Sequence, residues 1–319
     1  MKRKTENFEV TLRNPSGRRV SGSLLRSELT GEQLLLIQRR EKEVLRKRRE
    51  SFKEARLASF QEHEEGVLRR HREIHEDARL VILGRLADMS AETFTSPHLG
   101  VTLAQIDAGI WAMIKKFQLE VEEATHWALD DGVTNMFNEI EWWDKKFPRG
   151  PMGFDREMRL PRVTEPEKLI VEKFTASLNA YGNSLIEEIR RRLTQHLAMQ
   201  SNWNEMAMDV AGKLRESAIT GTRRKTEQIV RTAVLEALGA GRQAALEKAA
   251  EVIPGLKRQW DSMLDEPTSD VCTYLHGKVV DLHEPWKWEE REIERPPANP
   301  NCRATVLPYH DDWLGDDAD

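Results

Sequence analysis

Two cysteines and two nearby histidines are the residues best suited to chemistry in this sequence. Cys272 and Cys302 are the only cysteines, and His276 and His283 lie between them. Two thiolates and two imidazoles form a ligand set that suits tetrahedral zinc. Two thiols also pack as small apolar groups or close a disulfide, and a thiol beside a histidine base has the composition of a nucleophile. The spacing singles out none of these, and we favour packing or a disulfide.

Three further residues have metal-binding or ion-pairing chemistry. His71 and His75 have the four-residue spacing that places two ligands on one helix face. Because the surrounding segment is highly charged, we expect both histidines to be solvated. Arg231 has the chemistry of an anion ligand, but we favour an ion pair with an acidic residue of the C-terminal region, Asp265 or Asp270.

A basic cluster lies between residues 39 and 56, where nine lysines and arginines stand against four glutamates, a local net charge of +5. Such cations neutralise DNA phosphates and release counterions. The interleaved glutamates are equally typical of a solvated or subunit-facing helix. The candidate DNA contacts are Arg39, Arg40, Arg46, Lys47, Arg48 and Arg49.

Common catalytic motifs are absent from the sequence. It contains no glycine-rich phosphate loop, no Gly-x-Ser-x-Gly and no His-Glu-x-x-His. We therefore predict that the protein is not an enzyme.

Composition favours a helical, elongated protein. Hydrophobic residues make up 39% of the chain and charged residues 32%, so much of the sequence must face solvent. The net charge of −5 argues against a protein that coats nucleic acid with its whole surface. The first residues have no apolar run behind them, unlike a signal peptide. No apolar run approaches the length of a membrane span, and we expect no membrane contact.

Helical patterns dominate most of the chain. No proline interrupts residues 30–88, which are rich in helix formers and in charge, and this predicts one long, partly buried helix. Apolar residues at steps of three and four predict core helices over 103–128 and 170–197. We also expect helices at 203–218 and 223–251 and irregular segments at 1–29 and 130–166.

The sequence changes character after Trp260. Short runs at 278–280 and 305–307 alternate with proline clusters, which predicts two or three short strands. Gly277 suits a turn with positive φ, and the prolines of residues 296–300 fix an extended segment. We predict a small knuckle in which Cys302 returns to the side of Cys272.

The order of residues between 226 and 308 is distinctive. An Arg-Thr pair and a Gly-Arg pair share one predicted helix, and an Asp-x-Cys, a Leu-x-Gly and a proline-rich Cys-Arg segment follow. The set is Arg231, Thr232, Gly241, Arg242, Trp260, Asp270, Cys272, Leu275, Gly277, Pro296, Pro297, Pro300, Cys302 and Arg303. This arrangement resembles the phage Mu F-like head-morphogenesis family. Asn299, Ala304 and Ala233 stand where family members often have His, Cys and an acidic residue, and the first two changes weaken a metal site.

These observations together predict a mainly α fold with a long N-terminal helix, a helical middle region and a small α+β C-terminal knuckle. The expected divisions are an arm (1–29), a charged helix (30–88), a helical middle region (89–220), the Mu F-like domain (221–310) and a solvated acidic tail (311–319).

The resemblance implies a structural minor head protein of a tailed bacteriophage. It implies contacts with the portal protein, the major capsid protein or packaged DNA, and a place in the head interior or near the portal after synthesis in the bacterial cytoplasm. The alternative is a DNA-binding or ejected effector protein carried in the virion.

Overall fold

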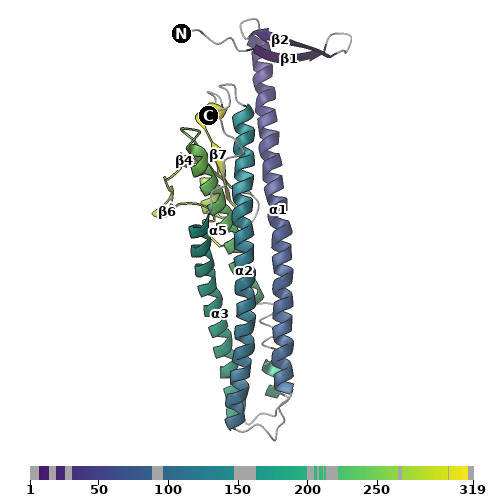
Figure 1. Ribbon diagram of the computed structural model, residues 1–319, viewed down its shortest axis with the longest axis vertical. Coiled ribbons are helices and arrows are strands. Elements are labelled where there is room, and N and C mark those ends of the chain that lie inside the picture. The colour runs from purple at the N-terminus through teal and green to yellow at the C-terminus, as the bar shows by residue number, and fades with distance from the viewer. Residues whose placement is uncertain are drawn as a thin grey trace. The chain divides into compact units, whose positions relative to one another are not determined.

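A computed structural model of the chain is mainly α-helical, with a few small antiparallel strands, as predicted (Figure 1). It divides into two compact units, Met1–Phe60 and Gln61–Asp319. The structure describes residues 7–13, 19–25, 31–87, 96–146, 163–199, 205–206, 208–210, 212, 222–264, 268–300 and 302–314.

The first unit contains a β-hairpin and the start of the longest helix. Strands β1 (Asn7–Arg13) and β2 (Arg19–Leu25) pair antiparallel. The expectation of an irregular segment over residues 1–29 was wrong for these residues. Apolar and polar residues alternate along β1, and this period of two is the signature of a strand. It outweighs the turn-forming residues on which the expectation rested.

Helix α1 (Gly31–Ala87) is continuous, which confirms the long helix predicted over residues 30–88. Most of its described side chains are exposed or half-buried, and the buried ones fall on its second half. They are Phe60, Val67, Leu68, His71, His75 and Ile82. The expectation that the two histidines are solvated was wrong, because they lie on the apolar stripe that packs on another helix.

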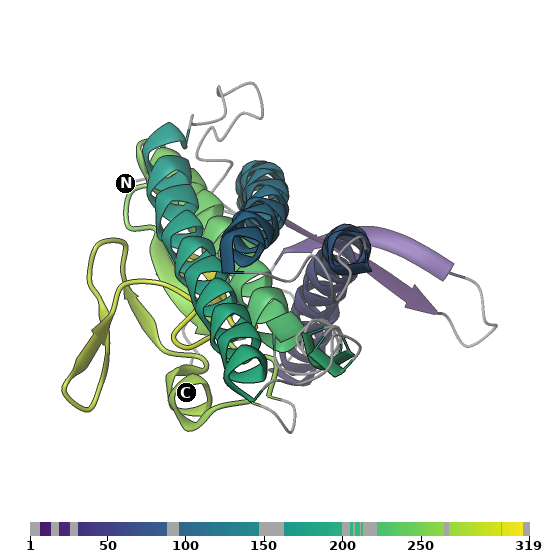
Figure 2. The same ribbon diagram turned by 90° about the horizontal axis from the view of Figure 1, so that it is seen from below.

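Three further helices build the core of the second unit: α2 (Ser96–Lys146), α3 (Thr164–Ala198) and α5 (Thr222–Ala250). They run side by side, and each packs on the other two (Figures 1 and 2). Apolar residues of the two predicted stripes are buried at these contacts. On α2 and α3 these residues are Ile106, Ile110, Met113, Phe117, Val121, Ala124, Ala128, Ile170, Phe174, Leu178, Tyr181, Leu185, Ile189 and Leu193.

The crossing of α2 and α5 is very close. A Cβ atom at Gly132 would lie 2.5 Å from the Leu238 carbonyl oxygen, and one at Gly241 would lie 2.2 Å from the Leu129 carbonyl oxygen. The irregular segment expected over residues 130–166 was wrong for residues 130–146, which belong to α2, and for residues 164–166, which begin α3. Gly132 serves the contact between backbones and does not interrupt the helix.

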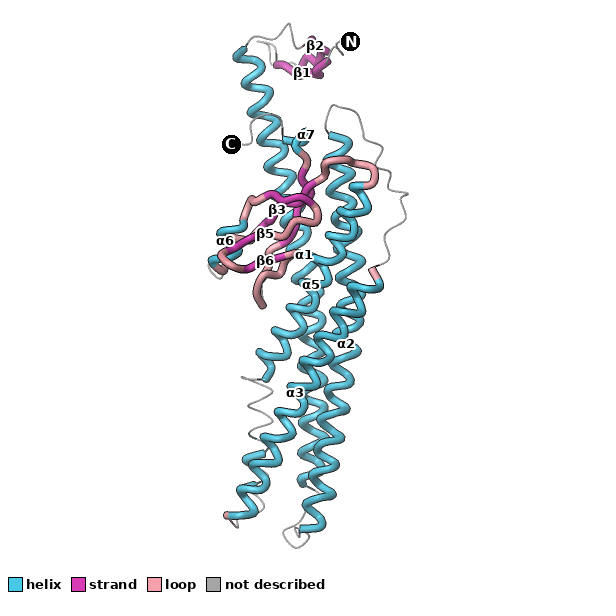
Figure 3. Tube along the Cα trace, turned by 90° about the vertical axis from the view of Figure 1, so that its left-hand side faces the viewer, coloured by secondary structure: helices cyan, strands magenta, loops and turns pink. Residues whose placement is uncertain are grey.

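The C-terminal part of the second unit carries the sheet and a short helix (Figure 3). Strands β4, β3 and β7 form an antiparallel sheet in that order, and β5 pairs with β6. The strands predicted at 278–280 and 305–307 are thus present. The elements are β3 (Lys257–Asp261), α6 (Asp270–Leu275), β4 (Val279–Asp281), β5 (Trp286–Trp288), β6 (Arg291–Ile293), β7 (Thr305–Tyr309) and α7 (Asp311–Leu314).

The described end of the chain docks on the helices. The ring of Trp313 is buried in α7 and stacks on Trp143 of α2 at 5.9 Å between centroids. Asp311 accepts a hydrogen bond from Lys257 at 3.0 Å. The start of the expected acidic tail is therefore part of the fold, and residues 315–319 lie outside the described residues.

Candidate functional site

The knuckle brings its two cysteines together, as the sequence predicted. Cys272 lies in α6 and Cys302 lies just before β7, and their Sγ atoms are 3.0 Å apart as free thiols. Both side chains are buried. Thirty residues separate them in sequence, so the turns between them decide this contact.

A hydrogen-bonded chain explains the first turn. Gly277 has φ +79°, a conformation that costs glycine little. Its N–H donates to the Trp260 carbonyl oxygen at 2.8 Å, and the Trp260 N–H donates to the Lys278 carbonyl oxygen at 3.0 Å. The Trp260 indole donates to Ser262, whose hydroxyl donates to the Cys272 carbonyl oxygen at 2.6 Å. Strand β3 is thereby fixed to the helix that carries the first thiol.

The proline-rich segment returns the second thiol. The Pro296-Pro297 peptide is cis. A Cβ atom at Gly239 of α5 would lie 2.6 Å from the Pro296 carbonyl oxygen, so the segment lies directly on that helix. After it, the Cys302 N–H donates to the Asn299 carbonyl oxygen at 3.0 Å. This turn directs Cys302 inward, and Pro300 is exposed on its outer side.

The two thiols have different electrostatic environments. The neighbouring Cys272 thiol, helped by backbone N–H groups of Ala304, Ala298 and Asn299, lowers the pKa of Cys302 to about 6 against the opposing effect of burial. The hydrogen bond to Cys302, together with burial, raises the pKa of Cys272. The pair therefore favours a single negative charge, held on Cys302 and stabilised by the Cys272 S–H.

A cavity of about 550 Å³ lies beside the thiols. Its lining includes Cys272, Cys302, Arg303, Arg231 and Glu64. Arg231 of α5 donates to the Glu64 carboxylate of α1. This partner differs from the acidic residues that we expected. Asp270 is exposed, and residue 265 lies outside the described residues.

Gly241 and Arg242 together hold α5 against α2 and the sheet. Gly241 allows α5 to approach α2, and the next residue then reaches Glu139 of α2 through two hydrogen bonds of 3.1 and 2.9 Å. The Arg242 guanidinium also donates to the Val306 carbonyl oxygen of β7 at 2.8 Å. Arg242 thus joins two helices and the sheet. Thr232, the other helical motif residue, donates to the Gln228 carbonyl oxygen of its own helix.

Sequence reasoning missed one central residue, Arg258. It is buried in β3, and its guanidinium donates to the carbonyl oxygens of Glu284 at 2.7 Å and Glu294 at 2.6 Å. It also lies 4.3 Å from the centroid of the Trp286 ring. The alternation of residues within β3 could have predicted its burial, because Arg258 lies on the same face of the strand as the buried Trp260. Arg258 holds the loops around β5 and β6 to the sheet.

The four zinc ligands considered from the sequence do not share one environment. Nδ1 of His276 accepts a hydrogen bond from the Ser262 N–H at 3.0 Å. His283 is 80% exposed at its side chain and lies 3.8 Å from Glu247. Within the described ranges, no group of three or more His, Cys, Asp or Glu residues has the arrangement of a metal site.

The basic cluster lies on the part of α1 that belongs to the first unit. Arg39, Arg46, Lys47 and Arg48 are exposed, and Arg49 is half-buried. Two of the cations pair with glutamates one turn away, Lys47 with Glu43 at 2.7 Å and Arg46 with Glu50 at 4.0 Å. The side chain of Arg40 lies outside the described residues. Part of the cluster's charge is thus balanced within the helix itself.

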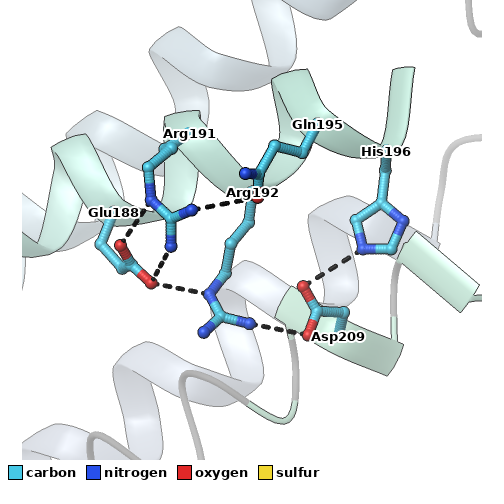
Figure 4. Close-up of polar contacts among 6 residues, drawn as sticks. All are labelled: Glu188, Arg191, Arg192, Gln195, His196 and Asp209. Atoms are coloured by element: carbon cyan, nitrogen blue, oxygen red, sulfur yellow. Dashed lines mark hydrogen bonds and ion pairs between the residues drawn. The ribbon is translucent and has the colours of Figure 1, made fainter. Parts of the chain in front are cut away.

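A second polar network ties the end of α3 to the helical residues 208–210 (Figure 4). Arg192 donates to Glu188 and to Asp209, each at 2.8 Å, and His196 lies 3.2 Å from Asp209. Arg191 and Arg192 lower the pKa of Glu188 to about 2. Burial raises the pKa of Asp209, but hydrogen bonds and charge from Arg192 and His196 outweigh it and lower that pKa overall. Two ionised carboxylates suit an electrostatic clamp better than a general acid.

A comparison with protein families found a match, and it includes both the cysteine pair and the polar network of Figure 4. Residues 185–307 match the family model described as phage Mu protein F like protein. This part of the chain is similar to the phage Mu F-like family. The match begins within α3, upstream of the first motif residue considered from the sequence, so the matched region includes the polar network of Figure 4 as well as the cysteine pair.

Two further findings accompany this match. No curated protein and no solved structure matched the chain. Among the described residues, no helix has both the length and the apolar character needed to cross a membrane. The similarity of residues 185–307 to this family points to a phage head-morphogenesis protein.

Proposed function

We propose that this protein is a minor structural component of a tailed-phage head, which acts in head morphogenesis by contacting the portal protein or the major capsid protein. The match of residues 185–307 to the Mu F-like family carries the proposal. The site supports it, because the described motif residues with known partners serve packing. The hydrogen bonds of Arg242 and Trp260 go to other residues of the fold.

Purified particles of the encoding phage test this function. Mass spectrometry should detect the protein in intact heads at a low copy number relative to the major capsid protein. Crosslinking within those heads should join it to the portal or to the major capsid protein. Absence from intact particles, combined with normal head assembly after deletion of its gene, would contradict the proposal.

The exposed cations of α1 favour a second contact, with packaged DNA. Arg39, Arg46, Lys47 and Arg48 stand within about two and a half helical turns and face solvent. An ejected DNA-associated protein would leave with the genome, whereas a head component would remain. Comparing full particles with particles that have ejected their DNA distinguishes the two roles.

A further inference from the structure

The cavity beside the cysteines gives the thiol pair access to small molecules. Cys272 and Cys302 both contribute to its wall, and their Sγ atoms are already 3.0 Å apart. A disulfide between them requires only a short further approach of the sulfur atoms.

The two sulfur atoms are not equivalent. The backbone N–H groups of residues 298, 299 and 304 help to lower the pKa of the Cys302 thiol. Converging N–H donors stabilise a thiolate, which is the reactive form in thiol exchange. Cys272 and Cys302 share a hydrogen bond of 3.0 Å between their sulfur atoms, and this bond together with burial raises the pKa of Cys272 and favours its protonated form. The arrangement assigns attack to Cys302 and resolution to Cys272.

The charged residues that line the cavity favour a negatively charged ligand. Arg231 and Glu64 line it as an ion pair, and Arg303 adds a second guanidinium to a lining that also includes Thr268 and Ser269. Guanidinium groups recognise carboxylates through paired hydrogen bonds. A small molecule that carries carboxylates suits this lining better than a neutral one.

We propose that Cys302 and Cys272 form a thiol–disulfide exchange site that accepts a small, carboxylate-bearing disulfide through this cavity. The Cys302 thiolate attacks one sulfur of the small disulfide, forming a mixed disulfide and releasing one thiolate. The Cys272 thiol then transfers its proton to the released thiolate and attacks the Cys302 sulfur, which expels the second thiolate. The second thiolate takes up from water the proton that Cys302 released on ionising, so the two cysteines are oxidised and the small disulfide is reduced to two thiols.

The new bond has a structural consequence. It joins α6 to the segment that enters β7 and closes a loop of about thirty residues, which restricts the unfolded chain. The thermal midpoint of the domain should therefore rise on oxidation. Under the proposed function, this bond would close when the particle leaves the reducing host cytoplasm, and only this consequence rests on that function.

The order of attack is tested with the full chain and oxidised glutathione. Samples are quenched with acid, and their cysteine-containing peptides are mapped by mass spectrometry. The unmodified protein should form the internal disulfide and release two molecules of reduced glutathione per chain. Cys272→Ser should stop at a glutathione adduct on Cys302, whereas Cys302→Ser should react at Cys272 about tenfold more slowly.

The charge preference has its own matched comparison. Arg303→Gln should slow the reaction with oxidised glutathione and leave the reaction with neutral hydroxyethyl disulfide nearly unchanged. Circular dichroism establishes that each variant is folded. Where a variant is not folded, trapping the unmodified protein at early times with iodoacetamide identifies the cysteine that first carries glutathione.

Three outcomes would overturn the proposal. The folded protein could keep both thiols while the guanidinium-unfolded protein is oxidised under the same conditions. The first adduct could form at Cys272. Equal slowing of both disulfides by Arg303→Gln would remove the assigned preference for carboxylates. None of these outcomes bears on whether the protein is found in phage heads, which the particle experiment decides separately.

Discussion

Arg242 and Glu139 expose only 2% and 3% of their side-chain surfaces, and their ion pair is therefore buried. Moving an ion out of water is costly, and the paired geometry with the extra hydrogen bond to Val306 offsets that cost. The charge pair therefore acts as a fixed joint between α2, α5 and β7. Arg258 has a similar role in β3, where main-chain carbonyl oxygens accept its hydrogen bonds.

Removing one partner of this joint should be more damaging than removing both. Arg242→Met leaves the Glu139 carboxylate buried without the Arg242 guanidinium, and we expect the free energy of unfolding to fall by about 3–5 kcal/mol. The double variant Arg242→Met with Glu139→Leu should recover part of that loss. Urea unfolding of the four members of this cycle measures the coupling. A double variant as unstable as the sum of the single variants would contradict it.

The buried histidine pair makes the helix packing sensitive to acid. His71 stacks on Phe117 of α2 at 3.8 Å between ring centroids. Neither of its ring nitrogens has a hydrogen-bond partner in the described part of the chain. Burial, with a smaller effect from His75, lowers the pKa of His71 to about 3. The folded state therefore keeps this imidazole neutral.

Stability should fall as the pH drops below about 6.5, because the unfolded chain then binds a proton that folded His71 rejects. Between pH 6.5 and 4.5 the loss from this group should approach about 2–3 kcal/mol. His71→Phe, which keeps a ring against Phe117, should flatten the pH dependence of the unfolding free energy. His283→Gln, at a side chain that is 80% exposed, provides the control and should leave the dependence unchanged. Equal curves for the unmodified protein and His71→Phe would contradict the assignment.

At the scale of elements, the close crossing of α2 and α5 positions the Mu F-like domain. The crossing depends on Gly132 and Gly241, whose missing side chains let the two backbones meet. The clamp of Figure 4 joins α3 to residues 208–210, and Arg242 joins α5 to β7. Ordinary helix propensity disfavours glycine in these helices, so its presence reflects packing.

Alanine substitution separates packing from propensity. Gly241→Ala would place a Cβ atom 2.2 Å from the Leu129 carbonyl oxygen, and we expect a loss of about 1–3 kcal/mol as the helices separate. Gly84→Ala on α1, where a Cβ atom meets nothing within 4 Å, should stabilise the protein by up to about 1 kcal/mol. Thermal unfolding of the two variants gives the comparison. A stabilising Gly241→Ala would mean that the crossing is looser than described.

At the scale of the whole molecule, the charge of the first unit differs from that of the chain. The chain has a net charge of −5, while residues 39–56 carry +5. A protein with this distribution can contact DNA through one helix without coating it. The same helix can equally contact an acidic surface of another head protein.

Charge reversal distinguishes these partners. Replacing Arg39, Arg46, Lys47 and Arg48 with glutamate should weaken DNA binding similarly for all sequences and flatten its dependence on salt. The same four changes to glutamine provide an intermediate control. DNA binding that is unaltered by the glutamate variant, combined with a lost crosslink to portal or capsid protein, would assign the cluster to a protein contact.

The sequence determined the parts of this protein that depend on local pattern. The apolar periods of α2 and α3, the proline-free run of α1 and the turn at Gly277 predicted their structures, because helix and turn formation depend on neighbouring residues. The ordered motif between 226 and 308 pointed to the Mu F-like family. The contact of Cys272 with Cys302 followed from the turns that the sequence contains.

Only the tertiary structure decided which residues meet across long distances in the chain. Arg231 pairs with Glu64 across 167 positions, and Arg242 pairs with Glu139 across 103. His71 was expected to be solvated because its own segment is charged, yet the stripe it shares faces α2. Gly132 was interpreted as part of an irregular segment, but it lies within α2 at the contact with α5. In each case the decisive interaction belongs to another element, and the pattern of a single segment contains no information about the surface on which it packs.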